Sequence, residues 1–138
     1  MAHRPAPGFQ KYPGYQINFS PEPEHVSVAA GETTIAESSR AIRVQESKHH
    51  TVWYLPMEDV NAALLSPSET ETYCPFKGTA RYWHVNAGDQ HIEDALWAYP
   101  EAFDECSAIE GYASFYADRV EIRIGGDAEA ASPPGFAT

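Results

Sequence analysis

The residues best suited to chemistry stand close together between Thr72 and Trp83. This stretch carries the thiol of Cys74, the amine of Lys77 and the guanidinium of Arg81 among several aromatic rings. An amine at a tight turn beside a guanidinium and an indole makes a clamp for an anion or a carbonyl-bearing molecule. The alternative is a surface lysine and an arginine paired with one of the 20 acidic residues, an arrangement that contributes little to stability.

Cys74 also suggests covalent chemistry. A cysteine thiolate acts as a nucleophile when a histidine, here His84 or His91, lies within hydrogen-bonding reach of it. In the same enzymatic interpretation Lys77 acts as an amine or electrostatic group, and Tyr82 or His84 transfers a proton. The competing interpretation is that a cysteine followed by proline in a strand is a small buried hydrophobic residue.

Aromatic residues form a second cluster, for which the sequence offers two explanations. Their rings would hold a cation or a flat heterocycle in a cage, or they would fill the core of a β domain. The set consists of Trp53, Tyr54, Tyr82, Trp83, Trp97, Tyr99, Tyr112 and Tyr116. The residues predicted to bind a ligand are Lys77, Arg81, Trp83, Trp97, Tyr99, Trp53 and Arg40. Arg40 and Glu46 bracket a hairpin, and pairing with each other or exposure to solvent is preferred over a place in the cleft.

No metal or other cofactor is expected. The six histidines offer one plausible ligand cluster, His84 and His91 with Glu93 and Asp94, and a metal site needs three or four converging ligands. No C-x-x-C motif occurs. The two cysteines are predicted to be free thiols, as is usual for an isolated pair in a cytosolic protein.

The charge balance limits the class of partner. The net charge is −11, from 9 basic and 20 acidic residues. Nucleic acids and anionic membrane surfaces are both bound through Lys and Arg, so neither is expected as a partner. No apolar run is long enough to span a bilayer, and the N-terminus lacks the apolar stretch of a secretory signal. We therefore expect a cytoplasmic protein.

The elements that must position these residues are mainly β-strands. Residues 25–125 predict a single β domain of roughly eight strands, at the spacing typical of sandwiches and barrels. The last two strands, 112–116 and 120–124, are expected to pair as a hairpin. One short helix is predicted over 57–65, because Pro56 precedes it and acidic residues fill its first turn.

Two terminal segments flank this domain. Residues 1–24 contain five prolines, which predicts an extended arm without helix or strand. Aromatic residues in the arm suggest that it lies against the domain or docks onto a second copy of the chain. Residues 126–138 are small and rich in Gly and Pro, and predict a flexible tail.

Several motifs, in this order, resemble the domain-of-unknown-function 427 (DUF427) family. They are Val52-Trp53-Tyr54-Leu55-Pro56 with Glu58-Asp59-Val60, then Cys74-Pro75-Phe76-Lys77-Gly78 with Ala80, Tyr82 and Trp83, then Trp97 with Tyr99-Pro100, and finally Phe115-Tyr116. The resemblance covers about residues 26–125 and leaves the arm outside. It implies a compact β-tent-like arrangement of coiled antiparallel sheets.

The resemblance does not carry over a chemistry. Zinc-carrying tent domains of similar shape use paired cysteines that this chain lacks, so metal binding is not transferred. A nucleotidyltransferase label attached to the family would need a carboxylate cluster for Mg²⁺ and a glycine-rich phosphate cradle, and neither is found. Three functions stay open: a small-ligand-binding module, which we prefer, an enzyme using Cys74 or Lys77 in group transfer or hydrolysis, and an oligomeric interaction domain.

Overall fold

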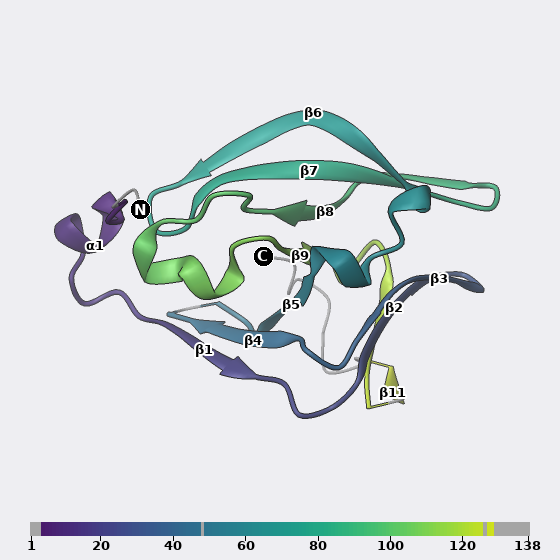
Figure 1. Ribbon diagram of the computed structural model, residues 1–138, viewed down its shortest axis with the longest axis horizontal. Coiled ribbons are helices and arrows are strands. Elements are labelled where there is room, and N and C mark those ends of the chain that lie inside the picture. The colour runs from purple at the N-terminus through teal and green to yellow at the C-terminus, as the bar shows by residue number, and fades with distance from the viewer. Residues whose placement is uncertain (1–3, 48, 126, 129–138) are drawn as a thin grey trace.

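The computed structural model describes residues 4–47, 49–125 and 127–128. Within these residues the strands form two antiparallel sheets, and the mainly-β prediction is confirmed. The larger sheet has seven strands in the order β1-β4-β5-β9-β8-β7-β6, and the smaller has four in the order β11-β10-β2-β3. In Figure 1 the edge strands β6 and β1 lie at the top and bottom of the view with the rest of the larger sheet between them.

The elements have the following bounds. The strands are β1 (Ile17–Pro21), β2 (Val26–Ala30), β3 (Thr33–Ser38), β4 (Ile42–Glu46), β5 (Val52–Pro56), β6 (Leu65–Cys74), β7 (Gly78–Ala87), β8 (Gln90–Ala98), β9 (Tyr112–Phe115), β10 (Glu121–Ile124) and β11 (Asp127–Ala128). The helices are α1 (Pro7–Lys11) and three 3₁₀ helices, η1 (Met57–Asp59), η2 (Ala62–Leu64) and η3 (Asp104–Ile109).

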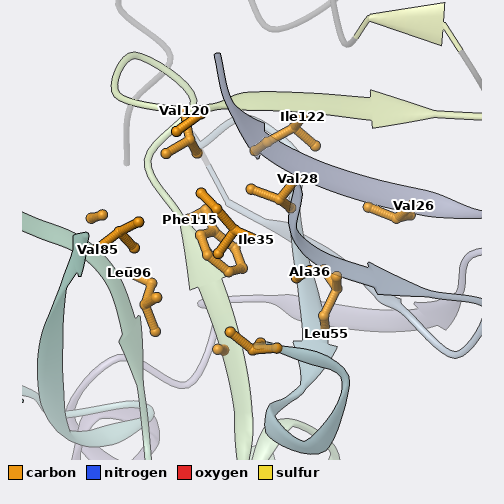
Figure 2. Close-up of a cluster of buried hydrophobic side chains, with 14 of the residues drawn as sticks. Val26, Val28, Ile35, Ala36, Leu55, Val85, Leu96, Phe115, Val120 and Ile122 are labelled. Atoms are coloured by element: carbon orange, nitrogen blue, oxygen red, sulfur yellow. The ribbon is translucent and has the colours of Figure 1, made fainter. Parts of the chain in front are cut away.

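Aliphatic side chains from both sheets form the main core. Along β8, Leu96 and Ala98 belong to this core, because alternate side chains of a strand point to the same face. Val26 and Val28 of β2 contribute from the smaller sheet and are completely buried. Figure 2 shows Phe115 of β9 lying between Leu96 and Val28 in this core. One face of the larger sheet is thereby fixed against the smaller sheet.

The opposite face of the larger sheet carries the aromatic residues. Trp97 lies between Leu96 and Ala98 in the sequence but belongs to a second buried cluster, together with Tyr54, Tyr99 and Val44. Among the described residues no strand of the smaller sheet contributes to this second cluster; the segment that holds η3 contributes Cys106 and Ile109 instead. Part of this aromatic face therefore stays open, and it provides the wall of the candidate site.

The helix expected over 57–65 is not formed, and this expectation was wrong. The segment contains η1 and η2, separated by Val60 in an extended conformation. Val60 forms a bridge with Ala36, and the Asn61 N–H donates to the carbonyl oxygen of Ile35. Contacts with β3 thus take the backbone groups that a continuous helix would have used. The expected hairpin is also absent, since β9 pairs with β5 and β8 while β10 pairs with β2.

The N-terminal arm is not the unstructured extension that its prolines predicted. Residues 7–11 form α1, with proline at its first position, and β1 pairs with β4 as an edge strand. An edge position tolerates proline, since one side of the strand needs no backbone partner. The expected flexible tail, 126–138, lies outside the described residues except for β11, which pairs with β10.

In the part of the chain that the structure describes, no helix has the length and apolar character needed to span a membrane.

Candidate functional site

The turn between β6 and β7 places Lys77. Cys74 pairs with Gly78 across the turn, and Gly78 has a φ of +129°, a conformation that L side chains rarely adopt. A Cβ at Gly78 would also stand 2.8 Å from the carbonyl oxygen of Glu101. The turn is fixed from the other side as well, because the Phe103 N–H donates to the carbonyl oxygen of Lys77. Lys77 is therefore held by its backbone and is only 9% exposed.

The ammonium of Lys77 pairs with a carboxylate far away in the sequence. Its Nζ lies 2.5 Å from Oε1 of Glu46, the last residue of β4. The Lys77 and Glu46 side chains are 11% and 13% exposed. Glu46 was expected to contact Arg40 or solvent, and that expectation was wrong. The curl of the larger sheet brings the end of β4 opposite the turn between β6 and β7.

Tyr15 completes this polar group. Its hydroxyl donates to the other carboxylate oxygen, Oε2 of Glu46, and its ring stacks on Phe76 at a centroid distance of 4.1 Å. Burial raises the pKa of Tyr15, and the hydrogen bond to Glu46 and the Glu46 charge raise it further. The phenol is therefore a neutral donor at physiological pH. Both oxygens of Glu46 thus have a partner, one cationic and one neutral.

These residues line a cavity of about 380 Å³, which we call the Lys77 cavity. It is lined by Tyr15, Val44, Glu46, His49, Val52, Tyr54, Tyr73, Cys74, Pro75, Phe76, Lys77, Tyr82, Trp97, Tyr99 and Tyr116. These residues come mainly from β4 and β5 on one side and from β6, β7 and β8 on the other. The curled larger sheet therefore encloses the cavity between its own two halves.

The aromatic walls of the cavity are held by contacts with one another. The Trp97 Nε1–H donates to the Tyr54 hydroxyl over 3.2 Å, and the two rings meet edge to face. The Tyr116 ring also packs against Trp97, at a centroid distance of 4.5 Å. Burial raises the pKa of Tyr54, Tyr99 and Tyr116, so these phenols are neutral near pH 7. The walls thus combine apolar area with a few hydroxyl groups.

The two cysteines are free, as predicted, and lie in different environments. Cys74 is partly exposed and lines the Lys77 cavity. Cys106 is buried, its Sγ lies 3.3 Å from the carbonyl oxygen of Phe76, and burial raises its pKa to about 12. Only Cys74 is therefore positioned to meet a ligand.

The structure brings together five of the predicted site residues in this cavity: Lys77, Trp97 and Tyr99 from the ligand-binding set, and Cys74 and Tyr82 from the catalytic set. It adds residues that were not singled out, chiefly Tyr15 and Phe76. Tyr15 was signalled only by the aromatic content of the arm, and Phe76 by its place in the motif around Lys77.

Four predicted ligand-binding residues lie elsewhere. Arg81 and Trp83 project from the face of β7 opposite to Tyr82 and line a separate open groove, where Arg81 pairs with Glu71 at 3.0 Å. The Trp53 Nε1–H donates to Glu22. The fourth, Arg40, pairs with two acidic residues, Glu58 and Asp59. The sequence spacing of Lys77 and Arg81 therefore does not make one clamp.

His84 and His91 lie at the far end of β7 and β8. Six strand positions separate Gly78, opposite Cys74, from His84, which corresponds to about 20 Å at the usual rise per residue. The structure therefore does not place either histidine beside the Cys74 thiol. Glu93 and Asp94, the carboxylates predicted to lie near these histidines, belong to a separate network of polar contacts.

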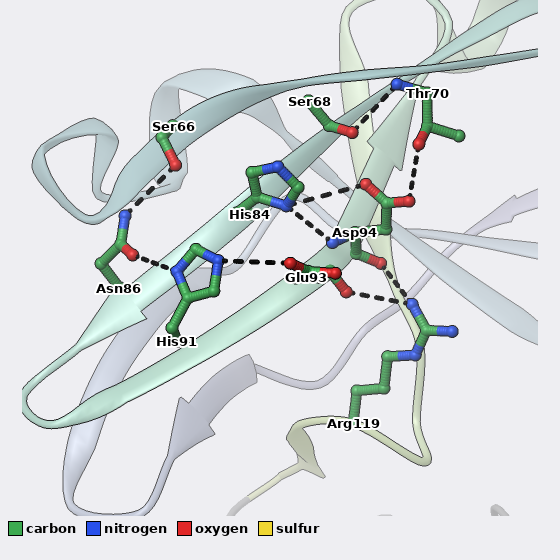
Figure 3. A network of polar contacts seen from close by, with 9 residues as sticks. All are labelled: Ser66, Ser68, Thr70, His84, Asn86, His91, Glu93, Asp94 and Arg119. Atoms are coloured by element: carbon green, nitrogen blue, oxygen red, sulfur yellow. Dashed lines mark hydrogen bonds and ion pairs between the residues drawn. The ribbon is translucent and has the colours of Figure 1, made fainter.

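Figure 3 shows that network of polar contacts. His84 Nδ1 accepts from the Asp94 backbone N–H at 3.1 Å, and Thr70 donates to the Asp94 carboxylate at 2.8 Å. Desolvation opposes ionisation of Asp94, but hydrogen bonds and nearby positive groups outweigh it and lower its pKa. His91 Nδ1 lies 2.6 Å from Oδ1 of Asn86, and His91 Nε2 lies 3.9 Å from Oε2 of Glu93. Among the described residues no group of three or more ligating side chains converges as a metal site would require.

The comparison with known families gives one match. The sequence model of the family described as a domain of unknown function (DUF427) matches residues 18–126. The match begins earlier than the motifs suggested, and it includes most of β1. No curated protein matches the chain.

Proposed function

The chain belongs to the DUF427 family, and we propose that this member binds a small metabolite in the Lys77 cavity. The observation that supports the proposal is a nearly buried ammonium at the wall of an aromatic cavity. Ligand sites are typically concave and mostly apolar, with a few polar groups that fix orientation. The volume of about 380 Å³ falls within the usual range for such sites, about 300 to 1,000 Å³.

Lys77 supplies the orienting donor. An ammonium has three N–H groups, and among the described residues Glu46 is its one hydrogen-bond acceptor. Two N–H groups of a side chain with little access to solvent are then available to a ligand. A carbonyl or another acceptor would satisfy them, while Trp97 and Tyr99 supply apolar contact area.

A thermal-shift screen with a library of metabolites tests this proposal. We expect at least one compound to raise the melting temperature of the full chain, and we expect Lys77→Met to lose that shift. Lys11→Met is the matched control, because Lys11 is exposed and lies outside the Lys77 cavity. Failure of every compound on the wild-type protein, or equal shifts in both variants, would contradict the proposal.

Enzymatic group transfer or hydrolysis is the second candidate, because Cys74 lines the same cavity as Lys77 and Tyr82. It predicts that a compound found in the screen is converted, or leaves a covalent mass on Cys74 in intact-protein mass spectrometry. A compound that binds and is recovered unchanged from the native protein, with no adduct on Cys74, leaves binding as the function.

Location and partners are proposed on the same chemical grounds. Free thiols support a reducing compartment such as the cytoplasm. The net charge of −11 supports a protein without a nucleic-acid partner. The arm contacts its own chain, where Gly8 N–H donates to the Pro75 carbonyl oxygen and Phe9 packs on Phe76 at 4.9 Å. Light scattering before and after deletion of residues 1–16 would test whether the arm also joins two copies.

A further inference from the structure

We propose that the Lys77 cavity selects neutral, flat heterocycles that carry a cyclic amide, with the ring carbonyl on Lys77 and the adjacent ring N–H on Glu46. This inference rests on the proposed binding function and names the class of ligand. The sequence left open whether the ligand is anionic or carries a carbonyl group. The Lys77–Glu46 pair favours a ligand that carries a carbonyl group.

The spacing of donor and acceptor supports this assignment. Lys77 Nζ and Glu46 Oε1 lie 2.5 Å apart, and both residues line the cavity. Standard bond lengths place the oxygen and nitrogen of a cyclic amide about 2.3 Å apart. Two roughly parallel hydrogen bonds can therefore form, one from the ammonium to the carbonyl and one from the ring N–H to the carboxylate. Bonds in which one partner is ionised are stronger than neutral ones.

The charge balance of the cavity disfavours an anion. Among the described residues that line it, Lys77 and His49 are the basic side chains and Glu46 is the acidic one. The Lys77 charge is already compensated by Glu46, and His49 is exposed to solvent. A carboxylate or phosphate bound to Lys77 would stand beside the Glu46 carboxylate, at a pair whose side chains are only 11% and 13% exposed. Like charges at such a distance repel strongly, whereas a neutral amide edge uses both groups.

The walls select for a flat ring. Trp97, Tyr99, Tyr54 and Tyr116 are all partly or completely buried, and Trp97 makes ring contacts with both Tyr54 and Tyr116. Aromatic side chains stack on planar systems and add apolar area. Pockets of this size enclose most of the surface of a small ligand, and one mono- or bicyclic heterocycle fits the volume.

Three probes of similar size test the amide edge by isothermal titration calorimetry on the full chain. Quinolin-2(1H)-one carries the adjacent carbonyl and N–H, N-methylquinolin-2-one lacks the donor, and 1-naphthoate replaces the amide by a carboxylate. We expect quinolin-2(1H)-one to bind. The affinity of the N-methyl compound should be lower by a factor of about ten or more, because one charge-assisted hydrogen bond is lost. We expect 1-naphthoate not to bind. Equal affinity for the first two, or tighter binding of 1-naphthoate, would overturn the inference.

Glu46→Gln separates charge from shape. It leaves the Lys77 ammonium without a compensating charge, so we expect 1-naphthoate to gain affinity and the quinolinone to lose it. Glu71→Gln, which removes a carboxylate in the Arg81 groove, is the control and should change neither. If 1-naphthoate does not gain on Glu46→Gln, the proposed role of Glu46 is wrong. If no probe binds while the metabolite screen yields Lys77-dependent ligands, the ligand class is wrong and the binding function stands; if both fail, the function itself is wrong.

Discussion

The buried ion pair between Lys77 and Glu46 allows a quantitative prediction about stability. Removing one member of a fully buried pair costs about 3–5 kcal/mol, because the other charge is left uncompensated. Here the side chains keep 11% and 13% of their exposure, and Tyr15 still donates to Glu46. We therefore expect Lys77→Met to lower the free energy of unfolding by about 2 kcal/mol. For a chain of this size the melting temperature should fall by about 8 °C.

The double variant decides whether this cost comes from the unpaired charge. In Lys77→Met/Glu46→Gln the amide at position 46 carries no charge and its oxygen still accepts the Tyr15 hydroxyl, so we expect the stability to lie within about 1 kcal/mol of the wild type. The coupling energy between the two positions should be about 2 kcal/mol. Urea denaturation of the wild type, the two single variants and the double variant measures it, and Lys11→Met should stay within about 0.5 kcal/mol of the wild type. Additive effects at positions 77 and 46 would refute the reasoning.

Three further predictions concern the fold. Because burial raises the pKa of Cys106 from 9.0 to about 12 and raises that of Tyr54 above 10.0, the folded state binds more protons at alkaline pH; the free energy of unfolding in urea should fall from pH 9 upward, and a flat profile to pH 11 would contradict this. Gly78→Ala should destabilise by about 2 kcal/mol, because it combines a left-handed backbone with a close approach to Glu101; a loss below about 0.5 kcal/mol in urea would contradict the turn geometry. A thiol reagent should label Cys74 in the native protein and Cys106 only after unfolding, and comparable rates for both in mass spectrometry would contradict the burial difference.

The strands and their two faces were largely accessible from the sequence. Alternation along β8 separates Leu96 and Ala98 from Trp97 and Tyr99, and the structure places the two sets in different cores. The tight turn expected at Lys77 is present between Cys74 and Gly78, and Gly78 adopts a positive φ there. These signals are local, because side-chain direction in a strand and backbone freedom at a glycine depend on near neighbours.

The errors came from contacts between distant segments. The helix expected over 57–65 was replaced by a bridge between Val60 and β3, and the expected last hairpin was replaced by strands in two different sheets. Lys77 and Arg81 are four residues apart and line different hollows of the surface. The partner of Lys77, Glu46, is 31 positions away, as is Tyr15 from Glu46. No pattern within one strand encodes such a meeting, which follows from the curl of the whole sheet.

The same ion pair bears on why the cavity is built as it is. A well-packed apolar pair of similar volume is often as stable as a buried ion pair, or more stable, so stability alone does not explain Lys77 and Glu46. Two apolar side chains in place of Lys77 and Glu46 could have packed against the rings of Tyr54, Trp97 and Tyr99 and completed this cluster. Placing a donor and an acceptor there adds a charged pair to a cavity lined mainly by aromatic rings. If this pair serves recognition, the double variant should stay folded and yet lose ligand binding; a double variant that still bound the same compound would assign recognition to the rings alone.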